Sequence, residues 1–230
     1  VGDFEQNQLD QLVDKYFGQR KNPEDQIKRV DVVEPERTQV ERFEKTRPNV
    51  PLPALAMTYF APPSDSEDIP AIEIAQAILA DGESSRLYQE LVYKQQLAQS
   101  AEFFADIRID KGLLAFYAIA AGGKKLEDIE KAILAEIEKL QETGPTEKEV
   151  EKAKNKLITD ILQQRQTVDG KAFAIGEAII YKNNARAVNE DVAKLQAVTA
   201  QDVQNVLKKY LKENSRAVIY YRNGSEGEDK

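Results

Sequence analysis

The chain contains no histidine and no cysteine among its 230 residues. Histidine is the usual general base and the commonest metal ligand, and the cysteine thiolate is the usual soft ligand and nucleophile. Their absence excludes a Ser-His-Asp triad, a Cys-His pair and a histidine-ligated zinc site built from this chain alone. Catalytic chemistry within the chain would have to use carboxylate, lysine, tyrosine or serine groups.

Long apolar runs and clustered basic residues are also missing. No stretch of about 18 or more apolar residues occurs, so we expect no membrane span. The formal net charge is -8, and the basic residues alternate with acids along the chain, as in 148–156, which argues against a nucleic-acid partner. With 41% hydrophobic residues the chain can bury a core, so we expect a soluble protein. Both a cytoplasmic and a periplasmic location fit a chain without cysteine.

The beginning of the chain has the pattern of a truncated unit. Val1 to Phe4 carry neither an initiator methionine nor a basic leader, and we expect them to be the tail of a strand that starts upstream. Residues 5–17 place apolar side chains at helical spacing, and Gly18 is a suitable stop. We therefore predict four parts: residues 1–18 from a preceding unit, a connector over 19–37, one α+β domain over 38–222, and a polar tail over 223–230.

Strand and helix patterns alternate irregularly through the rest of the chain. Thr146 and Thr199 each open a helix, and the first of them does so in a capping box. The predicted extended segments are 27–33, 38–46, 52–60, 98–109, 113–121 and 217–221. The predicted helices are 69–80, 86–95, 126–141, a long helix after 146, 173–181, 188–198 and a last helix after 199. This order predicts an α+β fold in which an antiparallel-rich sheet carries helices on one face.

Several segments resemble one family, the pitrilysin/insulinase-type zinc peptidases, together with the mitochondrial processing peptidases. Together they span nearly the whole chain in the order that the family shows. They are Val1-Gly2-Asp3-Phe4 with Lys15-Tyr16-Phe17-Gly18, the Ser84-Ser85-Arg86-Leu87-Tyr88 segment, Gly144-Pro145-Thr146-Glu147-Lys148-Glu149, and Val198-Thr199-Ala200-Gln201-Asp202-Val203.

The resemblance implies one half of a clamshell-shaped peptidase. In that family two homologous halves face each other, and the first half carries an H-x-x-E-H zinc motif. This chain has no histidine, so the resemblance makes it the non-metal half. No cofactor and no metal ligand is then expected in this chain. Zinc would belong to a catalytic half, in cis or in trans, and the partners would be that half and a peptide substrate.

The family's non-metal half often presents an Arg and, seven residues later, a Tyr to the substrate. The matching positions hold Val92 and Gln99, so neither the guanidinium nor the phenol is present. Gln99 retains an amide that can donate a hydrogen bond to a peptide carbonyl. Tyr93 and Lys94 are adjacent polar residues, but one step along a helix turns a side chain by about 100°, and the role is not moved onto them.

Two residues are candidates for substrate binding, and none is a candidate for catalysis. Arg86 is placed to reach the substrate chamber, or to form a structural ion pair that anchors the loop to the helix. Gln99 is placed to line the chamber, or to expose an edge amide. Gly82 to Ser85 lack the spacing of a phosphate-binding loop. The acids at 65, 67 and 68 suit a helix start better than a calcium site.

We expect the chain to be the substrate-enclosing, non-metal half of a zinc-dependent peptidase that itself cleaves nothing. The alternative is a catalytically silent assembly subunit of the same superfamily, which Val92 and Gln99 favour. A third hypothesis, an independent carboxylate enzyme, would require a spaced acid pair in an apolar setting, and the sequence has none.

Overall fold

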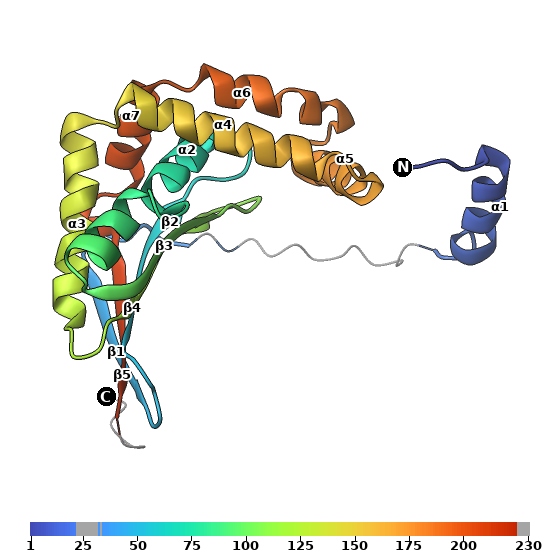
Figure 1. Cartoon of the computed structure of the whole chain (residues 1–230). Coiled ribbons are helices and arrows are strands. Elements are labelled where there is room, and N and C mark those ends of the chain that lie inside the picture. Colours follow the sequence, from blue (N-terminus) through green and yellow to red (C-terminus); the bar gives the residue numbers. More distant parts are fainter. Residues whose placement is uncertain (22–31, 33, 225–230) are drawn as a thin grey trace.

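The computed structural model describes residues 1–21, 32 and 34–224, and its centre is a five-stranded sheet (Figure 1). The strands lie in the order β1-β5-β2-β4-β3. Their bounds are Glu41–Arg47 for β1, Ala54–Ala61 for β2, Ala98–Asp106 for β3, Gly112–Ala120 for β4 and Ala217–Asn223 for β5. Only the β1–β5 pair is parallel. The predicted antiparallel-rich α+β sheet is therefore confirmed.

One face of the sheet is covered by helices, which Figure 1 shows on a single side. In β2, Leu55, Met57 and Tyr59 are almost fully buried, while the residues between them are half-buried, as expected for one covered face. The covering elements are α2 (Ile69–Ala80), the π-helix η1 (Tyr88–Lys94), α3 (Leu126–Thr143) and α7 (Ala200–Tyr210). This layer arrangement is the predicted one.

A second group of helices extends beyond the sheet as an arm. It consists of α4 (Glu147–Gln164), α5 (Val168–Lys182), the 3-10 turn η2 (Ala185–Asn189) and α6 (Asp191–Ala197) (Figure 1). The 3-10 turn η3 (Glu213–Ser215) precedes β5. The predicted caps are present: Thr146 and Thr199 both form capping boxes. The single helix predicted over 188–198 is instead divided between η2 and α6.

Glu130 ties α3 to the last and first strands of the chain. Glu130 is only 4% exposed. Its carboxylate accepts hydrogen bonds from Arg42 of β1, at 2.7 and 2.9 Å, and from the Tyr220 hydroxyl of β5. Burial acts to raise the Glu130 pKa, but the Arg42 and Tyr220 hydrogen bonds outweigh burial and lower it. The carboxylate is thus held ionised at the edge of the core.

The N-terminal segment differs from the prediction. Val1 to Phe4 do not form a strand. A strand needs a neighbouring strand to pair with, and this segment pairs with none of the five strands of the described sheet. The predicted helix is confirmed as α1 (Gln6–Phe17), and none of its residues is buried. Except for Val32, the extended segment predicted over 27–33 lies outside the described residues, as does most of the connector. β5 runs to Asn223, the first residue of the predicted tail, and Asn223 pairs with Arg47 of β1.

Candidate active-site-facing corner

The junction between η1 and β3 has an irregular backbone. In η1 the Gln95 amide donates to the Glu90 carbonyl oxygen five residues earlier, at 3.0 Å, as in a π-helix. Gln96 then adopts a φ of 51°, which is uncommon for a residue with a side chain. The Leu97 amide returns to the Leu91 carbonyl oxygen at 2.8 Å. Such irregularities are frequent at functional sites, so this corner is the first candidate.

The irregularity continues into β3 as a β-bulge at Gln99. Ala98 pairs with Ala120 and Ser100 pairs with Ile119, so Gln99 is an extra residue without an opposite partner. Its side chain is exposed and forms no hydrogen bond with another residue that the structure describes. The bulge therefore directs a free amide outward at the start of an edge strand.

Side-chain contacts hold the corner in this shape. Leu87 and Leu91 are completely buried and anchor one side of η1 in the core. The Glu90 carboxylate accepts hydrogen bonds from the Gln95 amide group, at 2.8 Å, and from Lys94, at 3.1 Å. Gln95 first and Lys94 second lower the pKa of Glu90, so it stays charged and fixes the end of the helix.

Arg86, at the start of this segment, is turned toward α4. Its Nε donates to Glu149 Oε1 at 2.7 Å and one terminal nitrogen donates to Oε2 at 3.0 Å, a two-pronged pair. Glu149 also accepts hydrogen bonds at 2.8 Å from the backbone amide and the hydroxyl of Thr146, which completes the capping box. Burial acts to raise the pKa of Glu149, but Arg86 and Thr146 outweigh it and lower the pKa to about 2.

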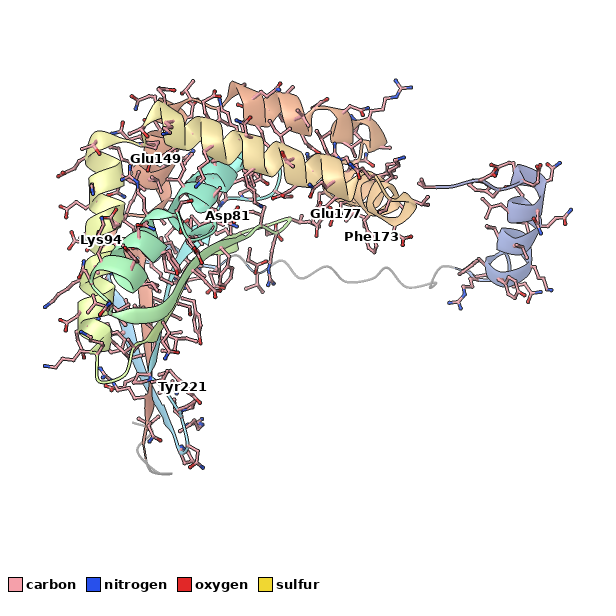
Figure 2. All side chains as sticks on the ribbon, in the orientation of Figure 1. Asp81, Lys94, Glu149, Phe173, Glu177 and Tyr221 are labelled. Carbon is pink, nitrogen blue, oxygen red and sulfur yellow. The ribbon has the colours of Figure 1, made fainter. Side chains whose placement is uncertain are left out.

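Arg86 also lines a shallow hollow of about 330 Å³ between η1, α3 and α4. Figure 2 shows Lys94 on η1 and Glu149 at the start of α4, and both residues line this hollow. The second terminal nitrogen of Arg86 is buried and forms no hydrogen bond within the described part of the chain. The geometry is that of the structural ion pair considered for Arg86, and no contact joins Arg86 to Gln99. Substrate contact by either residue stays a prediction.

Val92, which stands at the position of the family's Arg, is less exposed than the two residues that follow it. Val92 is half-buried, whereas Tyr93 is 70% exposed and Lys94 points outward beside it. The phenol and the ammonium group, rather than Val92, are therefore accessible at this corner. Sequence reasoning missed this because it assumed α-helical turns, and propensity does not distinguish a short π-helix from an α-helix.

The corner offers hydrogen bonding but no metal chemistry. Gln99, Tyr93 and Lys94 supply an amide, a phenol and an ammonium group, all suited to peptide carbonyls or carboxylates. Over the described ranges 1–21, 32 and 34–224, no group of three or more His, Cys, Asp and Glu side chains is placed to hold a metal ion. The arrangement therefore supplies hydrogen-bonding groups of the kind that a peptide backbone can pair with.

The comparison with known families agrees with this chemistry. A family description called the peptidase M16 inactive domain matches residues 1–157, more than half of the chain. The chain belongs to this family. The resemblance to pitrilysin/insulinase-type zinc peptidases is thereby confirmed, and the chain is a non-catalytic domain of that family.

Similar proteins include zinc proteases and a subunit of a mitochondrial complex. The zinc protease PqqE of Helicobacter pylori is 24% identical over 224 residues, which is 96% of this chain and 50% of that protein. Subunit 1 of the mitochondrial cytochrome b-c1 complex of Caenorhabditis elegans is 26% identical over 220 residues, 90% of this chain and 46% of that protein. The chain thus spans about half the length of these relatives.

Solved structures show the same fold. The crystal structure of a protease from Helicobacter pylori has a TM-score of 0.89 and 22% identity, and covers 96% of this chain and 54% of that chain. An inactive peptidase domain from Bordetella parapertussis has a TM-score of 0.69 and 26% identity, and covers 77% of this chain and 94% of that chain. No helix in the described part of this M16 domain is long and apolar enough to cross a bilayer.

Proposed function

We propose that the chain is the substrate-enclosing, non-metal half of a zinc-dependent peptidase, and that it helps to position a peptide against a separate zinc-carrying half. The observation that carries this proposal is the match of residues 1–157 to an inactive peptidase domain. The zinc ion, its ligands and the general base would all belong to the other half, in the same chain or in another. Hydrolysis would follow attack by zinc-activated water there.

In this proposal the η1–β3 corner is the part of the chain that meets the peptide. Gln99 would donate its amide to a peptide carbonyl, and the exposed Tyr93 and Lys94 would lie beside it. Arg86 would meet the peptide only where its pair with Glu149 opens, because Glu149 engages two of its nitrogens and the third is buried.

The test compares the chain alone with the complete two-half protein. The chain alone should bind no stoichiometric zinc and cleave no peptide, whereas the complete protein should cleave peptides in a chelator-sensitive manner. Stoichiometric zinc with chelator-sensitive activity in the chain alone would overturn the proposal.

A catalytically silent assembly subunit is the second candidate function. The similarity over 90% of the chain to a protein named as a cytochrome b-c1 complex subunit favours it, and so do Val92 and Gln99 at the family's Arg and Tyr positions. The two candidates differ in one result. If the complex retains full peptide turnover when this chain is removed, the assembly role is supported and the substrate-enclosing role is lost.

A further inference from the structure

A large hollow in the described part of the molecule lies beneath α5. It measures about 1770 Å³ and is bordered by α2, the end of α4, α5, α6 and the start of α7, with Ile107 after β3. Phe173, Glu177 and Tyr181 line it from α5, and Glu73 lines it from α2. Figure 2 shows Phe173 and Glu177 projecting from α5.

The helix α5 carries large apolar side chains that the described part of the chain leaves exposed. Of its 15 residues only Ala178 is buried. Phe173 is 73% exposed, Ile180 69% and Ile179 50%, so apolar side chains face solvent on more than one side. A helix that is apolar on several sides belongs in a protein interior or an interface, and an isolated helix of this length is marginal in water. A permanent partner explains this pattern better than a peptide that binds transiently.

The charges around the hollow indicate what that partner carries. Eight carboxylates and four cationic side chains line it. All four cations are engaged locally: Arg165 and Lys182 pair with Asp191, Lys194 pairs with Glu190, and Lys209 pairs with Asp68.

Four of the lining carboxylates have no ion pair or hydrogen bond with any described residue: Asp65, Glu67, Glu73 and Glu177. Glu73 is an exposed residue on the wall of the hollow. Partial desolvation by the neighbouring protein, followed by repulsion from Asp191, raises its pKa, and Lys182 opposes this rise. A partner with basic side chains would relieve this excess of negative charge.

We infer that the hollow beneath α5 is the docking surface for the zinc-carrying half of the peptidase, and that it receives an apolar segment of that half that carries basic side chains. This inference rests on the proposed function. The position of residues 1–18, which the resemblance assigns to the preceding half, agrees with this inference. A Cβ atom added to Gly2 would lie 3.5 Å from Val168 Cγ1 at the start of α5. Gly2 therefore lies close to the start of α5.

The absence of cysteine allows a site-specific test. We would introduce Phe173→Cys on α5 and, as a matched control, Ala135→Cys on the exposed side of α3, and attach an environment-sensitive fluorophore to each. The labelled chain is then titrated with the zinc-carrying half produced as a separate chain. The label at 173 should become shielded from a soluble quencher, and the label at 135 should not change.

A charge and polarity variant adds a second measurement. Ile180→Asp should raise the dissociation constant between the two halves by about tenfold or more, since a charge replaces an apolar side chain that the interface would bury. Ile180→Leu should bind like the wild type. Because Ile180 is exposed in the free chain, an unchanged melting temperature of Ile180→Asp should confirm that the variant is folded.

The other outcomes are distinct. If the halves associate while the label at 173 stays accessible, the inference fails and the proposed function stands. Shielding that grows with the concentration of this chain alone would assign the hollow to a second copy. Shielding that requires added peptide would assign it to substrate, and both results overturn the inference. If the halves do not associate at all, the proposed function fails with it.

Discussion

Arg86 and Glu149 form a two-pronged ion pair although 63 residues separate them in the chain. The same Glu149 carboxylate closes the capping box of α4 through Thr146. One acidic side chain therefore fixes both the start of the arm and the entry to η1. Since η1 leads into the exposed corner at Gln99, this pair links the stability of the arm to the shape of the candidate site.

Replacing Arg86 by alanine should lower the free energy of unfolding by about 1–3 kcal/mol, because the half-buried Glu149 loses its guanidinium partner. For a chain of this size that corresponds to roughly 2–4 °C in melting temperature per kcal/mol. Arg86→Lys keeps the positive charge but loses the two-pronged geometry, so its free energy of unfolding should lie between those of the wild type and Arg86→Ala. Thermal unfolding should be measured together with peptide affinity in the complete protein. A lowered melting temperature with unchanged affinity would end the substrate-contact prediction, and the reverse would end the structural role.

The contribution of Glu149 should depend on pH. Its folded-state pKa of about 2 lies below its ordinary value of 4.5, so the ionised form stabilises the fold. That stabilisation is fully present above about pH 4.5 and is lost as pH falls toward 2. Glu149→Gln should therefore be less stable than the wild type at pH 7, and the two should converge near pH 2 in denaturant titrations. A difference that stays constant over this range would contradict the assignment.

Gln99→Ala should reduce peptide turnover of the complete protein by about tenfold or less, because one neutral hydrogen bond contributes about 0.5 to 1.5 kcal/mol. The side chain is exposed, so the melting temperature should stay unchanged. The ratio kcat/KM for a peptide is the measurement, and Glu102→Gln, also exposed on β3, is the control. Equal losses in both variants would count against a specific role for Gln99.

Glu73→Gln should raise the melting temperature of the chain slightly at neutral pH, because partial desolvation and repulsion from Asp191 disfavour the ionised carboxylate, while solvent at this exposed residue keeps the effect small. A carboxyl whose folded-state pKa is raised destabilises the fold above that pKa. The gain should therefore shrink as pH falls through the folded-state pKa toward the ordinary value of 4.5. Glu177→Gln, on the opposite wall of the hollow, is the control and should change little. A loss of stability in Glu73→Gln would show an unrecognised favourable contact.

Amide hydrogen exchange should separate α1 from the sheet. None of the α1 residues is buried, and a 12-residue helix without packing is marginal in water, so its amides should exchange quickly in the chain alone. β4 lies between β2 and β3 and should exchange slowly. Slow exchange over Leu9 to Phe17 with fast exchange over β4 would contradict this arrangement.

Local signals in the sequence predicted the local structure well. Thr146 followed by Glu149 predicts a capping box, and the structure contains it, because both partners lie within one helical turn. The repeat of apolar residues from Leu126 likewise predicted α3, which packs on the sheet.

Features that depend on distant contacts were not predicted. The parallel pairing of β1 with β5 joins the first and last strands, and no local pattern encodes it. The second role of Glu149, as the partner of Arg86, depends on the packing of η1 against α4. The π-helical form of η1 was not predicted either, because helix propensity alone does not distinguish the two helix types.

The position of β5 affects how the chain can be made. The strand β5 (Ala217–Asn223) lies between β1 and β2 although it is made long after β2 (Ala54–Ala61), so β2 has a neighbour on one side only until β5 has been synthesised. Pairing of such distant segments folds slowly, and unpaired strand edges promote aggregation. A nascent or nonsense-truncated chain that ends before Ala217 would expose two additional strand edges, on β1 and on β2. The sheet therefore reaches its full set of strand pairings only once β5 has been inserted.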